Sequence, residues 1–154
     1  MEKIAVIGAG LMGHGIAQVF AVTGHEVAIH DPFPEALARV PERVRANLHG
    51  LGLDESSVGK ISLHGTLDAA VEKADIVFEA APENLALKQD IFAKLSASTH
   101  AGCILASNTS VLPIGEIAAQ AGDPGRILGT HWWNPPYLIP LVEVIQAPRT
   151  DPVY

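Results

Sequence analysis

The sequence has little sulfur and little positive charge. Its 154 residues include one cysteine, and ten basic residues stand against 17 acidic ones, for a formal net charge of −7. A single cysteine cannot form a disulfide within the chain, so we expect a reducing, cytoplasmic location. The acidic balance, without any cluster of Lys or Arg, argues against binding to nucleic acid or to an anionic membrane surface.

Long apolar runs are also absent. Hydrophobic residues make up 48% of the chain, yet no apolar stretch approaches the ~20 residues that a transmembrane helix needs. The opening residues MEKIAVIGAG contain one basic residue and no cleavage pattern, so no signal peptide is expected. A chain of this length is large enough to bury the core of one domain, which we place over residues 1–154.

What is present is an alternation of short apolar runs and helix-length segments. The apolar runs predict strands at 3–8, 26–31, 60–65, 75–80, 103–107, 126–132 and 140–145. Helices are predicted at 11–23, 34–50, 84–98 and 113–120. Near-continuous apolar strands are typical of a parallel sheet covered on both faces. The pattern therefore predicts an α/β fold with a Rossmann-type, doubly wound, mainly parallel sheet, in which Cys103 is a buried strand residue.

The stretch GAGLMG is typical of a dinucleotide-binding turn. Gly8, Gly10 and Gly13 have G-x-G-x-x-G spacing between the first strand and a helix that Leu11 and Met12 open. The first glycine allows a tight turn, the second a close approach of backbone to pyrophosphate, and the third close packing of helix on strand. Unpaired N–H groups at the helix start favour phosphate.

A second strand supports this interpretation. It ends at Asp31, 23 residues after Gly8, where an acid binds a ribose 2′-hydroxyl. The PFPEA that follows lacks a Lys or Arg for a 2′-phosphate, so NAD is predicted rather than NADP. Two positions are open for His14: one near the pyrophosphate and, as we expect, one as a solvated residue of the first helical turn.

The stretch HWWNPPYLIPLVEV carries two titratable groups twelve residues apart, His131 and Glu143. His131 ends a strand, and ligands bind at the carboxyl ends of strands in open α/β sheets. A histidine suits the removal of a proton from an alcohol, and a carboxylate on its other ring nitrogen would fix the tautomer. Two plainer alternatives remain at this point: a hydrogen-bonded rim histidine, and a glutamate on a solvent-facing edge strand.

Ser110 lies in the stretch SNTS after another strand, where its hydroxyl can bind the reacting oxygen. No spacing of His, Cys and Asp indicates a metal, and no G-x-S-x-G indicates a hydrolase.

Four stretches together resemble the NAD-binding domain of the 3-hydroxyacyl-CoA dehydrogenase family: VIGAGLMGHGIAQVFA, EAAPENLALKQDIFAKL, ASNTSVLPI and HWWNPPYLIPLVEVI. The resemblance extends over nearly the whole chain. It implies that His131 and Glu143 are the catalytic pair, that Ser110 binds the substrate hydroxyl and that Asn134 also belongs to the catalytic site. It further implies cofactor-site roles for Glu83, Lys88 and Asn108.

Two departures from the family pattern bear on the substrate. Trp132 and Trp133 stand where 3-hydroxyacyl-CoA dehydrogenases usually have two phenylalanines, and NPPYLIPLVEV is closer to the gulonate and carnitine 3-dehydrogenase branch, which includes λ-crystallin. The family's C-terminal helical domain, which dimerises and closes the cleft, does not follow residue 154. We therefore expect the truncated N-terminal domain of a longer, homodimeric enzyme.

The expected function is NAD-dependent oxidation of a 3-hydroxyl to a ketone, as on a 3-hydroxyacyl-CoA. The alternatives are a free hydroxy acid such as gulonate or carnitine as substrate, and a non-catalytic, structural NAD-binding protein like λ-crystallin.

Overall fold

A computed structural model describes all residues, 1–154, and contains one seven-stranded sheet. Its strands lie in the order β3-β2-β1-β4-β5-β6-β7. The six strands β1 to β6 run parallel, and β7 is antiparallel to β6. This confirms the predicted α/β fold with a mainly parallel sheet. The strands are β1 (Ile4–Ile7), β2 (Val27–His30), β3 (Ile61–His64), β4 (Ile76–Glu79), β5 (Ile104–Ser107), β6 (Ile127–Trp132) and β7 (Val142–Gln146).

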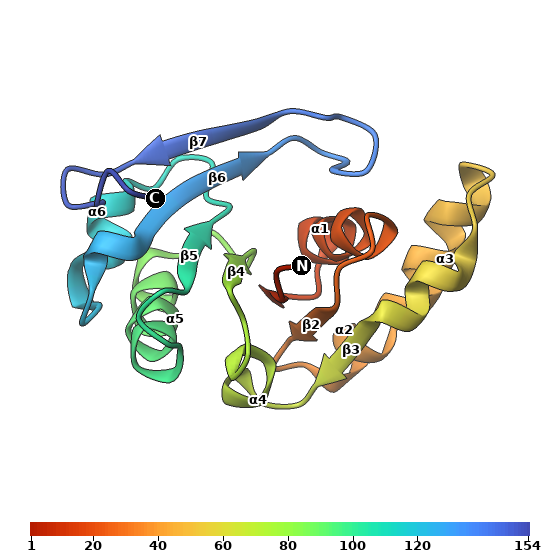
Figure 1. Ribbon diagram of the computed structural model, residues 1–154, viewed down its shortest axis with the longest axis horizontal. Helices are drawn as coiled ribbons and strands as arrows, with labels where there is room; N and C mark the ends of the chain where they lie inside the picture. Colours follow the sequence, from red (N-terminus) through yellow and green to blue (C-terminus); the bar gives the residue numbers. More distant parts are fainter.

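Helices cover both faces of the sheet (Figure 1). They are α1 (Leu11–Val22), α2 (Pro34–Ala38), α3 (Val40–Gly50), α4 (Leu67–Val71), α5 (Leu85–Ser98) and α6 (Ile114–Ile117), with short 3-10 helices η1 (Glu55–Lys60), η2 (Ala118–Gln120) and η3 (Pro124–Arg126). Figure 1 shows α1 and α3 on one side of the central strands, and α5 and α6 on the other. None of these helices is long and apolar enough to cross a lipid bilayer.

Two hydrophobic cores result, one on each face. In β1, Ile4 and Val6 belong to the core beneath α1 and α3, whereas Ala5 and Ile7 belong to the core beneath α4, α5 and α6. Alternate residues of a strand point to opposite faces, so a strand buried on both faces must be apolar throughout. This accounts for the near-continuous apolar runs of the sequence. Cys103 is fully buried in the second core, as predicted, immediately before β5.

Three helical segments differ from the predicted ones. The predicted helix 34–50 is two helices, and Pro41 lies in the first turn of the second, where its missing N–H costs no hydrogen bond. The segment predicted at 113–120 continues from α6 into the 3-10 helix η2. Helix α4 was not predicted, because its five residues are too few to show a period. Thr66 caps it by accepting from the N–H of Ala69.

The order of the strands in the sheet determines where a ligand-binding site is expected. From β1 the chain goes first to β2 and β3 on one side, and then to β4, β5 and β6 on the other. The carboxyl ends of β1 and β4 therefore lie at the point where the order reverses, which is where ligands bind in open α/β sheets. The loops after β1 and β4 carry the glycine-rich turn and Glu83, and other predicted site residues follow β2 and β5 at the same end of the sheet.

Candidate active site

The glycine-rich turn after β1 requires two of its three glycines for steric reasons. Gly8 has φ +105°, and a Cβ there would lie 2.7 Å from the carbonyl oxygen of Ala80 in the loop after β4. A Cβ on Gly13 would lie 1.8 Å from the carbonyl oxygen of Gly8. Gly10 differs, because nothing lies within 4 Å of an added Cβ. The turn is therefore packed tightly against β4 and α1, with open space over Gly10.

The start of α1 faces that open space. Gly10 is the N-cap residue, and no side chain caps the first turn. Gly10 is exposed and Leu11 is 61% exposed, so the start of α1 lies at the surface. Free N–H groups and the positive end of the helix dipole bind phosphate. The turn and α1 thus fit the pyrophosphate of a dinucleotide.

Asp31 lies beside the same turn, directly after β2. Its Oδ2 accepts from the N–H of Ala9 at 2.7 Å, and its Oδ1 accepts from the N–H of Phe33 at 2.9 Å. Each carboxylate oxygen keeps a further lone pair. The side chain is half-buried and held in place, which fits the recognition of a ribose hydroxyl.

The prediction for His14 is wrong. The residue is 5% exposed rather than solvated, and its Nδ1 lies 2.7 Å from the carbonyl oxygen of Gly10, which only an N–H at that nitrogen can satisfy. Burial lowers the pKa of His14; the bond to Gly10 opposes this, and the positive charge of Arg43 adds to the lowering. The ring is therefore a neutral part of the turn. The sequence did not show this because α3, which carries Arg43, is distant in the chain.

His131 and Glu143 are direct neighbours on the last two strands. The register of β6 and β7 pairs them, so both side chains lie on the same face. Nδ1 of His131 lies 2.6 Å from Oε2 of Glu143. The histidine side chain is 26% exposed and the glutamate 53% exposed, because β7 is the edge strand. The histidine's other ring nitrogen, Nε2, has no partner in the chain. Glu143 is therefore on a solvent-facing edge strand, as one alternative had it, and is also in contact with His131.

The loop after β5 is fastened to β6. Oδ1 of Asn108 accepts from the backbone N–H of Trp132 at 2.9 Å, next to His131. Ser110 is exposed, and its hydroxyl has no partner in the chain. Asn134 is also exposed, three residues beyond His131. Both side chains are free to bind a ligand at this edge of the sheet.

Glu83 holds that loop from the side of β4. Its Oε1 accepts from the hydroxyl of Thr109 and from the backbone N–H groups of Ser110 and Val111, the last two at 3.3 Å. Burial alone would raise the pKa of Glu83, but these three hydrogen bonds and the Lys88 ammonium lower it. The ionised carboxylate is thus the form that orders the Ser110 loop.

Beneath Glu83 lies a buried ion pair. Nζ of Lys88 is 2.6 Å from Oε1 of Glu79 and 3.7 Å from Oε2 of Glu83. It also donates to the carbonyl oxygen of Ala81. Lys88 is 1% exposed and Glu79 is fully buried. The lysine therefore lies beneath the loops and is not exposed at the surface where the nucleotide is expected. Ser107 donates to the other Glu79 oxygen at 2.6 Å.

Sequence reasoning missed Glu79. The available signal was an acid at the carboxyl end of an otherwise apolar strand, nine residues before Lys88. A carboxylate in that position has to be paired when the strand is covered on both faces.

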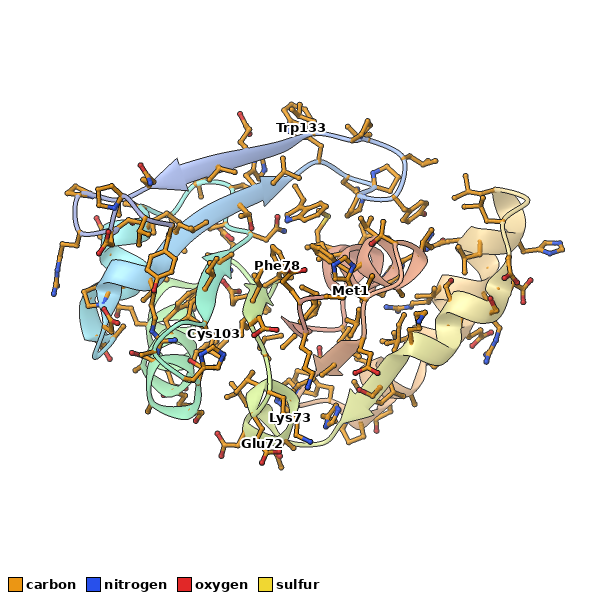
Figure 2. The ribbon with its side chains drawn as sticks, viewed as in Figure 1. Met1, Glu72, Lys73, Phe78, Cys103 and Trp133 are labelled. Atoms are coloured by element: carbon orange, nitrogen blue, oxygen red, sulfur yellow. The ribbon has the colours of Figure 1, made fainter.

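The two tryptophans have different surroundings. Trp132 packs edge-on against Phe20 of α1 and Phe78 of β4, with ring centroids 5.9 and 5.8 Å apart. Trp133 is 45% exposed, and its ring centroid lies 6.1 Å from that of His131. In Figure 2, Phe78 lies in the interior and Trp133 stands at the outer side of the β6–β7 hairpin. One tryptophan anchors the hairpin, and the other lies beside the His131–Glu143 pair.

The fold and its side chains together define a Rossmann-type dinucleotide-binding domain with a histidine–carboxylate pair at the same carboxyl end of the parallel strands as the glycine-rich turn. The model of the 3-hydroxyacyl-CoA dehydrogenase NAD-binding domain matches residues 3–154, and the chain belongs to this family of NAD-binding domains.

Named relatives agree with this membership. The chain is 42% identical over 156 residues to an L-carnitine dehydrogenase of Streptomyces griseus. This match covers 99% of this chain and 47% of that protein. It is 42% identical over 159 residues to a probable 3-hydroxybutyryl-CoA dehydrogenase of Bacillus subtilis, with coverage of 98% and 55%. The crystal structure of 3-hydroxybutyryl-CoA dehydrogenase from Escherichia coli K12 superposes with a TM-score of 0.92 at 36% identity, covering 97% of this chain and 33% of that one. The chain thus spans about half the length of the curated relatives that it matches.

Proposed function

We propose that this chain is the NAD-binding part of a dehydrogenase that reversibly oxidises a 3-hydroxyl group to a ketone. The observation that carries the proposal is the 2.6 Å contact between Nδ1 of His131 and Oε2 of Glu143, at the same carboxyl end of the parallel strands as the glycine-rich turn. A glycine-rich turn alone would serve any NAD-binding protein. A non-catalytic protein needs no histidine with one ring nitrogen fixed and the other open.

The pair supplies acid–base chemistry. Glu143 accepts the Nδ1–H of His131, so the neutral ring keeps its lone pair on Nε2. Nε2 removes the proton of the substrate hydroxyl, and the carboxylate stabilises the imidazolium that forms. Ser110 and Asn134, whose side chains are free, orient the reacting oxygen. A bound NAD would supply the hydride acceptor for the carbon that carries the hydroxyl.

The chain's own residues hold the cofactor in this proposal. Gly8, Gly10, Gly13 and the first N–H groups of α1, at Leu11 and Met12, bind the pyrophosphate. Asp31 binds the ribose hydroxyls of NAD and repels the 2′-phosphate of NADP. Asn108 and Glu83 lie at the nicotinamide end, with Lys88 supporting Glu83 from below.

A 3-hydroxyacyl-CoA is the first candidate substrate, and L-carnitine is the second. Trp133 favours carnitine, because its half-exposed ring lies beside His131 and an indole face attracts a quaternary ammonium group. Gulonate would gain nothing from that contact.

The proposal extends to the whole protein. Residues 1–154 form the NAD-binding domain, and a further region of the same polypeptide closes the substrate side and forms a homodimer. The exposed apolar residues along the β6–β7 hairpin support this: Leu138, Leu141, Val144 and Ile145. A cytoplasmic location is proposed on the single reduced Cys103 thiol.

The test is His131→Ala in the full-length protein, with His100→Ala as the matched control, since His100 is exposed and pairs only weakly with Asp75. Loss of the general base should lower kcat by ~10²–10⁴-fold. NADH affinity, measured by calorimetry, should stay close to that of the wild type. Wild-type turnover by His131→Ala would contradict the proposal. Parallel assays with L-carnitine and 3-hydroxybutyryl-CoA identify the substrate.

A further inference from the structure

A cavity lies between α1 and α3, beside the glycine-rich turn. Its volume is about 380 Å³, and it is lined by Leu11, His14, Arg43, Ala46 and Asn47. Leu11 and His14 belong to the first turn of α1, the same turn that presents its N–H groups over Gly10. The cavity is therefore continuous with the surface that fits a pyrophosphate.

Arg43 is the charged residue of this cavity. Its Nη1 donates to the carbonyl oxygen of Ala9 at 3.2 Å, which is its one hydrogen bond in the chain. No carboxylate lies within ion-pair distance of the guanidinium. The side chain is half-buried. A guanidinium has five N–H donors, so four remain free, and the positive charge is uncompensated.

The other polar groups of the cavity do not compete for the same ligand. His14 is neutral, because burial lowers its pKa and its Nδ1–H is bound to Gly10. Asn47 accepts from the hydroxyl of Tyr137 and donates to Gln18, so both ends of its amide are occupied. Arg43 thus provides the free donors.

Ala9 connects Arg43 to the nucleotide path. Asp31 accepts from the N–H of Ala9, and Arg43 donates to its carbonyl oxygen. One residue of the turn therefore has an acidic group on one side and a basic group on the other. A dinucleotide with its ribose hydroxyls on Asp31 would place its phosphates at the start of α1.

We propose that Arg43 is a further nucleotide-binding residue, whose guanidinium binds the diphosphate of the dinucleotide from the side of α3. The inference rests on the proposed NAD-binding function. An anion at the start of α1 receives N–H groups from the helix, and Arg43 adds the full charge and the planar pair of donors that match phosphate oxygens. The 2′-phosphate of NADPH is the other phosphate within this chemistry, but Asp31 opposes it.

The experiment compares Arg43→Ala with Arg45→Ala in the full-length protein. Arg45 lies on the same helix and is exposed, so it controls for net charge and for helix composition. Calorimetry gives the affinities for ADP-ribose, NADH, NADPH and adenosine. Arg43→Ala should weaken the binding of ADP-ribose and of NADH on the order of ten-fold, since a charge-assisted contact is lost. It should leave adenosine unchanged and flatten the dependence of affinity on salt concentration. Arg45→Ala should match the wild type, and Arg43→Lys should recover part of the loss.

Four results would overturn the assignment. Equal losses for adenosine and ADP-ribose would mean that Arg43 only fastens α3 to the turn. A loss confined to NADPH would place the guanidinium at a 2′-phosphate instead. Wild-type affinities in Arg43→Ala would exclude the role of Arg43 but leave the proposed NAD binding intact. A wild-type protein that binds no NADH would exclude the proposed cofactor function as well.

Discussion

Glu83 is a residue whose charge orders the loop that carries Ser110. Its pKa is lowered in the folded protein, so the ionised form is stabilised by folding. That stability is present above the pKa of an unfolded glutamate, which is 4.5, and is lost as the pH falls through the lower folded value. Glu83→Gln should therefore lower Tm at neutral pH, and the difference from the wild type should shrink on acidification.

Thermal unfolding measured between neutral and acidic pH checks this prediction. Glu72→Gln, at an exposed position just after α4, is the control and should leave Tm unchanged throughout. A difference that grows toward acidic pH would show that Glu83 is stabilised in its neutral form instead.

Lys88 is a second residue with a sharp consequence. Replacing it by Met leaves Glu79 buried with an uncompensated charge, because Lys88 is its only cationic partner. Removing one partner of a buried pair costs about 3–5 kcal/mol. Lys94→Met removes an equally short contact, 2.7 Å to Asp90, at a solvent-exposed site, and exposed pairs are worth only about 0–1 kcal/mol. Denaturant unfolding of both variants measures the contrast, and similar losses would disprove the buried role of Lys88.

Among the elements, the β6–β7 hairpin bears on the site through its contact with α1. The loop between the two strands extends over α1 (Figure 1), where Pro136 packs against Gly15. A Cβ on Gly15 would lie 3.0 Å from Cδ of Pro136, a tight contact that requires Pro136, in the hairpin that carries His131 and Glu143, to shift by a few tenths of an ångström. Displacement of a catalytic group reduces turnover sharply.

We therefore expect Gly15→Ala to lower kcat several-fold in the full-length protein while the chain stays folded, since Ala also favours α1 by about 0.5–1 kcal/mol. Gly115→Ala in α6 is the control, because nothing lies within 4 Å of its added Cβ. Steady-state kinetics and Tm measure the two effects separately. Unchanged kcat in Gly15→Ala would mean that the hairpin adjusts freely.

The elements also show how far sequence patterns reach. The inner strands β1, β2, β4, β5 and β6 were predictable because burial on both faces favours apolar residues at most positions, and the glycine motif was predictable because a Cβ has no room at Gly8 or Gly13. The break between α2 and α3 required knowing that Pro41 begins a new helix. The burial of His14 and the placement of Arg43 depend on the packing of α3 on α1, which no local pattern encodes.

At the scale of the whole molecule, several apolar side chains are exposed along the β6–β7 hairpin. Leu138, Leu141, Val144 and Ile145 are each at least 42% exposed along one hairpin at the edge of the sheet. Exposed apolar groups on an edge strand favour association. The 154-residue chain alone should therefore bind NADH, turn substrate over poorly, and self-associate with rising concentration.

Analytical ultracentrifugation checks the association. Val144→Lys should reduce it, whereas Leu63→Lys, on the opposite edge strand β3, should not. A chain that stays monomeric at high concentration would contradict the prediction, and turnover equal to that of the full-length protein would show that residues 1–154 complete the site.

The pairing of His131 with Glu143 sets a rule for which lengths of hairpin a natural or engineered variant can tolerate. The two residues meet because they are opposite each other in the ladder, one position before the pair of Trp132 and Val142. An insertion among residues 133–141 lengthens the loop but leaves the ladder intact. A single insertion within β7 before Glu143 turns that side chain to the other face of the sheet and separates it from His131. In distant descendants of this chain, the number of loop residues between His131 and Glu143 can therefore change, whereas both residues have to stay on the same face of the sheet.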